Sequence, residues 1–168
     1  RRNGLRWFGP GPLVRWRDAP WLFVGMAAQV GAVLLYLPFD VPSEDLEKPA
    51  KELIDATGGR NFSFAVLAVA VAVGAPIVEE LFYRGLVWRG FDLLLRGRAG
   101  TAARVVVPIV VSAVWFAGVR LEGLQFPALA LVGVICALAA RREGRLGPAI
   151  LVHMGFNVWT VVALGSQL

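Results

Sequence analysis

The sequence predicts an all-α membrane protein, a polytopic helix bundle with about five transmembrane helices. Hydrophobic residues make up 57% of the 168 residues and charged residues only 17%, which is too apolar for an ordinary soluble domain. The apolar residues form continuous runs, without the polar and apolar alternation of β-barrel strands. The arginines cluster between these runs, a pattern typical of membrane orientation. We therefore expect membrane lipid as a partner and no nucleic acid.

Five apolar runs are candidates for the spans. A transmembrane helix needs ~20 residues, and ~17 still suffice. The runs cover residues 20–38, 62–78, 105–119, 124–140 and 146–168. The third run is short, so we expect its helix to extend back through residues 101–104.

The charged residues predict how the chain is oriented. Segments 1–19 and 84–104 each hold five Arg against one Asp, and segment 141–145 holds three Arg against one Glu. Segment 40–60 is the exception, with six acidic and three basic residues. Cytoplasmic loops carry the excess of Arg and Lys. Residues 1–19 are therefore predicted to be a basic cytoplasmic segment, and residues 20–168 a membrane-embedded domain.

The acidic segment contains one candidate helix outside the spans. Pro49 is followed by "AKELIDATGG", in which Leu53 and Ile54 are apolar and Gly58 and Gly59 form a stop signal. We expect a brief amphipathic helix at the external interface; a plain loop is the alternative.

Polar side chains inside the apolar runs are the candidate site. Glu79 and Glu80 end the second run, and Arg84 is spaced to pair with Glu80 on one helix face. His153 and Asn157 share a face of the last run. An ionisable group at membrane depth costs ~2.5–3.5 kcal/mol, so it usually has a partner or a task. A buried Glu can act as a base toward water while His and Asn hold that water or stabilise an oxyanion, which favours hydrolysis without a covalent intermediate.

Structural interpretations of the same residues stay open at this point. The two glutamates can mark a cytoplasmic helix end neutralised by Arg84 and Arg89. His153 can be a hydrogen-bonded bundle residue, and Asn157 can bond across helices. A transporter or channel subunit whose Glu, His and Asn line a polar path is a further alternative.

Two motifs carry a resemblance to a known family. "EELFYR" (79–84), with "AP" at 75–76 before it and Gly85 after it, resembles the EExxxR signature of the CPBP family, the CAAX proteases and bacteriocin-processing enzymes, also called Abi. "HMGFN" (153–157) resembles the HxxxN signature of that family. The resemblance covers roughly residues 62–165.

The resemblance implies a fold, an activity and roles for five residues. The fold is an all-helical membrane bundle whose site opens toward the membrane interior, and bacterial members are mostly assigned as intramembrane metalloproteases. It implies a protein of the bacterial plasma membrane that hydrolyses a membrane-embedded or lipidated peptide. Glu79 would activate water with support from Glu80 and Arg84, and His153 and Asn157 would bind the water, a metal or the oxyanion. A degenerate member would instead be a non-catalytic partner in a membrane protein complex.

One position departs from the family pattern. The family carries FxxxH between the two motifs, and here "FAGVR" places Arg120 at the histidine position. Arginine stays protonated, so it neither accepts a proton nor binds a metal. Arg120 would either pair with Glu79 and weaken it as a base, or donate to an oxyanion. Counting residues along the apolar runs gives a third interpretation. Arg120 would be a solvated residue that ends its helix on the external side, whereas Glu79 and His153 would lie toward the cytoplasmic ends of their helices.

The arginine at position 120 also affects whether the site can bind a metal ion. Catalytic zinc generally takes three ligands from His, Glu, Asp or Cys. His153 is the only histidine and Cys136 the only cysteine of the chain. By resemblance a divalent metal such as zinc would rest on Glu79, His153 and Asn157, and we do not expect a tight site from this set.

Overall fold

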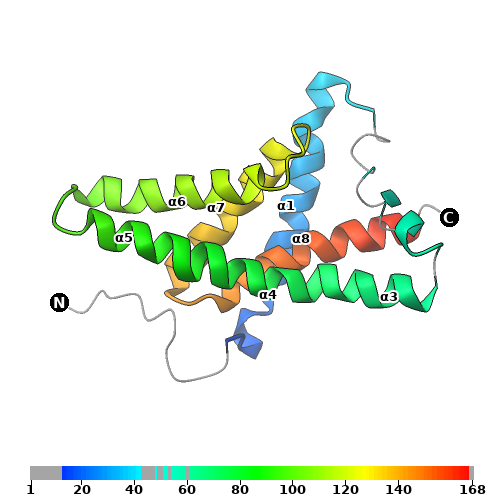
Figure 1. The fold of residues 1–168 in the computed structure, drawn as a ribbon, viewed down its shortest axis with the longest axis horizontal. Helices are drawn as coiled ribbons and strands as arrows, with labels where there is room; N and C mark the ends of the chain where they lie inside the picture. The colour runs from blue at the N-terminus through cyan, green and yellow to red at the C-terminus, as the bar shows by residue number, and fades with distance from the viewer. Residues whose placement is uncertain (1–12, 43–47, 49–50, 53, 60, 167–168) are drawn as a thin grey trace.

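The structure is a computed structural model that describes residues 13–42, 48, 51–52, 54–59 and 61–166. Within these ranges every regular element is a helix, which confirms the all-α prediction (Figure 1). The α-helices are α1 (Pro20–Tyr36), α3 (Phe62–Val69), α4 (Ala75–Glu80), α5 (Arg89–Leu95), α6 (Thr101–Gly118), α7 (Phe126–Glu143) and α8 (Gly147–Ser166). Two short 3-10 helices, η1 (Trp16–Asp18) and η2 (Leu37–Phe39), flank α1.

The longest element is one helix made of five consecutive segments. Segments α3, α4 and α5 are joined by two π-helical stretches, η3 (Ala70–Gly74) and η4 (Leu81–Trp88). Together they form a single helix of 34 residues from Phe62 to Leu95, which crosses the whole view in Figure 1. We call it the long helix.

The long helix corrects one prediction. The glutamates that end the apolar run 62–78 were expected near the cytoplasmic end of their helix, but they lie near its middle. The helix continues because the charges after the apolar run are paired inside the bundle and further apolar residues follow them.

Among the residues that the structure describes, three helices are long and apolar enough to cross a membrane. They are Trp16–Phe39, Phe62–Leu95 and Thr101–Gly118, and Gly147–Val162 is a shorter apolar helix. Helix α7 ends in two arginines and a glutamate after its apolar part. This set fits a polytopic membrane bundle, while the count of five spans and the orientation stay predictions. The start of α6 at Thr101 confirms the expected extension of the third run.

The first and last helices cross with their backbones in close contact. A Cβ atom at Gly25 would lie 1.9 Å from the carbonyl oxygen of Val152, and one at Gly155 would lie 2.0 Å from that of Leu22. Small residues allow such an approach between membrane helices. The crossing therefore fixes the part of α8 that carries the predicted histidine.

An ion pair with a buried carboxylate supports the same arrangement. Asp18 is 2% exposed, accepts a hydrogen bond from the backbone N–H of Arg15, and pairs with Arg145 in the turn between α7 and α8. This pair joins the start of α1 to the start of α8.

The acidic segment agrees with its prediction where it is described. Residues 48, 51–52 and 54–56 are helical. Gly58 and Gly59 follow with φ of 68° and 105°, a left-handed conformation that ends a helix and favours glycine. Pro49 and Leu53, like residues 1–12 of the basic segment, lie outside the described residues.

Candidate active site

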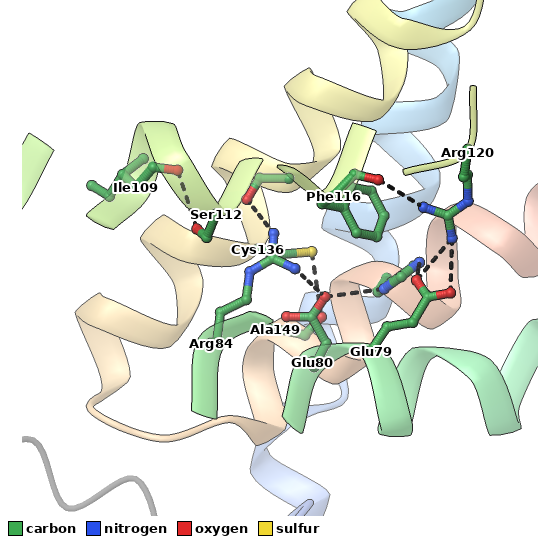
Figure 2. A network of polar contacts seen from close by, with 11 residues as sticks. Glu79, Glu80, Arg84, Ile109, Ser112, Phe116, Arg120, Cys136 and Ala149 are labelled. Carbon is green, nitrogen blue, oxygen red and sulfur yellow. Dashed lines mark hydrogen bonds and ion pairs between the residues drawn. The ribbon is translucent and has the colours of Figure 1, made fainter. Parts of the chain in front are cut away.

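The predicted site residues other than Asn157 meet where the middle of the long helix faces the start of α8 and the end of α6. Glu79 and Glu80 are consecutive, so their side chains leave the helix roughly 100° apart. Glu80 points into the bundle and is fully buried, whereas the side chain of Glu79 is 28% exposed. Figure 2 shows an inner set of contacts that begins at Glu80 and an outer set that begins at Glu79. His153 lies within reach of both carboxylates.

The inner contacts form a buried network around Glu80. Its Oε1 accepts a hydrogen bond from Arg84 Nη1 at 2.6 Å and lies 3.0 Å from His153 Nδ1. Arg84 Nη2 donates to the carbonyl oxygen of Gly133 at 2.5 Å. The side chains of Glu80 and Arg84 are 0% exposed and that of His153 is 2% exposed. The i,i+4 pair expected from the sequence is therefore present, and it is tied to both α7 and α8.

This network sets the tautomer of His153. A carboxylate only accepts hydrogen bonds, so the Nδ1 atom that faces Glu80 carries the proton. The other ring nitrogen, Nε2, lies 3.7 Å from Glu79 Oε2. In the neutral ring Nε2 is thus an acceptor directed toward Glu79.

The outer contacts join Glu79 to Arg120. Arg120 Nη2 lies 3.0 Å from Oε1 and 2.8 Å from Oε2 of Glu79. The guanidinium also lies 4.4 Å from the centre of the Phe116 ring, and Nη1 donates to the Phe116 carbonyl oxygen at 3.4 Å. The expectation that Arg120 is a solvated stop too far from Glu79 is therefore wrong.

The physical reason is the antiparallel pairing of the long helix with α6. The turn between Leu95 and Thr101 joins them. Glu79 lies 16 residues before Leu95 (95 − 79), and Arg120 lies 19 residues after Thr101 (120 − 101), so both reach similar depth. Counting from this turn, rather than from the ends of the apolar runs, would have predicted the contact.

Phe116 lies between the inner and outer contacts. Its position in the "FAGVR" motif did not indicate this placement. Its ring is 1% exposed and packs edge-to-face on the ring of His153, with centroids 5.1 Å apart. The Arg84 guanidinium carbon lies 5.3 Å from the same ring and that of Arg120 4.4 Å. One aromatic ring thus fixes a histidine and two arginines.

Gly133 was also missed by sequence reasoning. A Cβ atom at Gly133 would lie 3.0 Å from the Cα of Ala113, so the glycine lets α6 and α7 approach closely. Its carbonyl oxygen then becomes the acceptor for Arg84. In the sequence, a glycine within an apolar run was the feature that could have indicated this close approach of two helices.

The structure places Asn157 against the long helix rather than in the network. Its Nδ2 donates to the carbonyl oxygen of Val71 at 3.0 Å. Val71 lies in η3, and π-helical geometry alters the regular i→i−4 bonding. This contact matches the interpretation of Asn157 as a hydrogen-bonding residue between helices, and its role toward water stays a prediction.

The predicted metal ligands do not fit a catalytic zinc ion. Among the residues that the structure describes, no group of three or more His, Cys, Asp and Glu side chains is arranged to hold a metal ion. Both oxygens of Glu79 face the Arg120 guanidinium, and Asn157 bonds to a backbone carbonyl. A permanent cation therefore already contacts both oxygens through which Glu79 would bind a metal.

Comparison with protein families matches residues 61–159 to the family described as Rce1-like, type II CAAX prenyl endopeptidase Rce1-like. Comparison with curated proteins gave no match, and comparison with solved structures gave none. The matched segment includes the long helix, α6, α7 and the first part of α8, and so it contains every residue of the two networks. The chain therefore belongs to the Rce1-like family of type II CAAX prenyl endopeptidases, the CPBP family to which its two motifs pointed.

Proposed function

We propose that this protein is an intramembrane endopeptidase of the CAAX-protease type that hydrolyses a membrane-embedded or lipidated peptide. The observation that carries the proposal is the convergence of four side chains from two helices: His153 contacts the buried pair of Glu80 and Arg84 on one side and faces the partly exposed Glu79 on the other. Family membership supplies the reaction class, the cleavage of a peptide bond.

The proposed reaction uses Glu79 as the base. One Glu79 oxygen accepts a proton from water while the water oxygen attacks the carbonyl carbon of the scissile peptide bond. His153 Nε2, which lies 3.7 Å from Glu79 Oε2, accepts a second hydrogen bond from that water. The C–N bond then breaks, and Glu79 returns its proton to the leaving amine.

Charge develops on the carbonyl oxygen during the attack. Arg120 is permanently protonated, but its guanidinium is engaged by both Glu79 oxygens, so we assign it the role of a restraint on the base and not that of an oxyanion donor. Glu80 and Arg84 do not touch the substrate in this scheme. They position His153 by fixing the proton on Nδ1.

The test is cleavage by the full chain in lipid nanodiscs, with a lipidated peptide as substrate and mass spectrometry of the products. Glu79→Gln should abolish cleavage. Asp92→Asn is the matched control, because Asp92 is a partly exposed carboxylate paired with Arg104 elsewhere on the long helix. Equal cleavage by wild type and Glu79→Gln would show that Glu79 does not act in the reaction and would refute the proposal.

A non-catalytic membrane partner is the second candidate, and the ion pair of Glu79 with Arg120 is the observation that favours it. A carboxylate engaged by a guanidinium is a weaker base than a free one. If well-folded wild type and Arg120→His both leave all lipidated peptides intact, the catalytic proposal fails and the partner function gains support.

A further inference from the structure

We propose that Tyr83 is a further catalytic residue, whose hydroxyl donates a hydrogen bond to the oxyanion that forms on the scissile carbonyl. The inference rests on the proposed function, since it supplies a donor for the reaction at Glu79. Acyl transfer generally needs such a donor near the attacked carbonyl. Tyr83 stands at a position of "EELFYR" to which the sequence motif assigns no role.

The first observation is the position of Tyr83 on the long helix. Tyr83 follows Glu79 by four residues, just as Arg84 follows Glu80. Side chains four residues apart on a helix are neighbours, with Cβ atoms roughly 5–6 Å apart. The ion pair of Glu80 with Arg84 shows that this spacing brings side chains together here. The Tyr83 side chain also interacts electrostatically with Glu79 and Arg120, so it lies beside the proposed base.

The second observation is that the ring of Tyr83 is held in place. Tyr83 is 7% exposed, and its ring packs edge-to-face on Phe116 and Phe82, with centroids 5.4 Å and 5.1 Å apart. The same Phe116 ring packs on His153. One aromatic ring thus holds both Tyr83 and the histidine of the site. A donor that is already oriented needs no reorganisation during the reaction.

The third observation is the hydroxyl at the end of this buried ring. Among the described residues none forms a hydrogen bond with it, and its oxygen is not one of the fully buried side-chain atoms that lack a partner. The hydroxyl therefore lies at the accessible end of the side chain, with its O–H available as a donor. Tyr36 differs, because its hydroxyl donates to the carbonyl oxygen of Leu124 at 2.7 Å.

The other polar side chains of the site already have partners. His153 carries its proton on Nδ1, so the Nε2 atom that faces Glu79 only accepts. Arg120 Nη2 contacts both oxygens of Glu79. Asn157 donates to the carbonyl oxygen of Val71. These engagements leave the Tyr83 hydroxyl as the donor for the oxyanion.

The O–H bond of Tyr83 stays intact in this step. The water oxygen bonds to the carbonyl carbon, a water proton passes to Glu79, and the π electron pair of the carbonyl moves onto its oxygen. That oxygen accepts the hydrogen bond from Tyr83 until the C–N bond breaks and the carbonyl forms again. The hydrogen bond is strongest when the oxygen is charged, so it should affect kcat more than KM.

The first experiment measures kcat and KM for cleavage of a lipidated peptide by the full chain in nanodiscs. Tyr83→Phe removes the hydroxyl and keeps the ring that packs on Phe116. Its kcat should fall by about 10²–10³-fold with little change in KM. Tyr36→Phe is the matched control, since it removes a hydroxyl that bonds to a backbone carbonyl just before α7, and it should keep the wild-type kcat.

The second experiment measures binding and does not depend on turnover. A phosphinate peptide carries a tetrahedral centre with a charged oxygen at the scissile position, and a ketomethylene peptide of the same sequence is uncharged there; neither can be cleaved. Fluorescence anisotropy gives the affinity of both peptides. Tyr83→Phe should bind the phosphinate about 10–100-fold more weakly than wild type, because a hydrogen bond to a charged group is lost. Affinity for the ketomethylene peptide should stay unchanged.

The two experiments separate this inference from the proposed function. Cleavage with the same kcat in wild type and Tyr83→Phe would overturn the role of Tyr83 and retain the peptidase. If wild type cleaves no peptide, a selective loss of phosphinate affinity in Tyr83→Phe would still support the oxyanion donor, although the peptidase proposal fails. Unchanged phosphinate affinity, or an equal loss for both peptides, would overturn the inference.

Discussion

Two neighbouring carboxylates on one helix have opposite surroundings. Glu80 is fully buried, with Arg84 and His153 as partners, while Glu79 is partly exposed and pairs with Arg120. Removing one partner of a buried ion pair leaves the other charge uncompensated in the interior, whereas a more exposed pair contributes less to stability. The comparison separates a buried inner pair, which positions the histidine, from a partly exposed outer pair at which the proposed chemistry takes place.

The largest effect is expected from Arg84→Met, which tests whether the inner pair is fixed. Removing one partner of a buried pair costs about 3–5 kcal/mol of unfolding free energy, since the other charge stays uncompensated. Denaturation of the purified protein in mixed micelles measures this. The double variant Glu80→Gln with Arg84→Met should recover much of the loss, and no recovery would show that Arg84 acts through packing instead.

Glu79→Gln tests the other side of the comparison. Loss of a positioned base should lower the cleavage rate by about 10²–10⁴-fold. The free energy of unfolding should fall by less than it does for Arg84→Met, because the outer pair is partly exposed and the inner pair is fully buried. A large loss of stability here would mean that the outer pair is as structural as the inner one.

Arg120→His should raise cleavage modestly. Freeing Glu79 from an ion pair worth up to ~1 kcal/mol corresponds to a gain of about fivefold. Arg120→Gln serves as the comparison: an equal gain in both variants shows that the cation was the restraint, and a gain in the histidine variant alone shows that the imidazole contributes. A drop in cleavage in both variants would indicate that Arg120 assists the reaction.

The smallest effect is expected from Asn157→Ala, which measures how much one polar contact between helices contributes to the free energy of unfolding. Loss of its bond to the Val71 carbonyl should lower unfolding free energy by about 0.6 kcal/mol. Cleavage should change little if this bond is its main contact. A loss of cleavage as large as that of Glu79→Gln, with stability intact, would place Asn157 in the reaction.

Much of the fold and part of the site could be predicted from the sequence. Apolar runs fix the helical class, and the i,i+4 spacing of Glu80 and Arg84 gave their pairing. The apolar runs alone gave the wrong depth for Glu79, because an apolar run shows where charges begin and not where a helix ends; counting from the turn between Leu95 and Thr101 gives the depth. The contact with Gly133 was hidden because a backbone carbonyl has no residue-type signature.

The two π-helical stretches of the long helix lie on either side of Glu79 and Glu80. Each π turn is equivalent to a residue inserted into a regular helix, so losing one residue there would rotate everything beyond it by roughly 100°. Such a deletion would swing the glutamates away from His153 while leaving composition and hydropathy almost unchanged. Between Ala70 and Trp88 this helix therefore has a length that cannot vary, although much of the same stretch faces outward and its side chains are far freer to change.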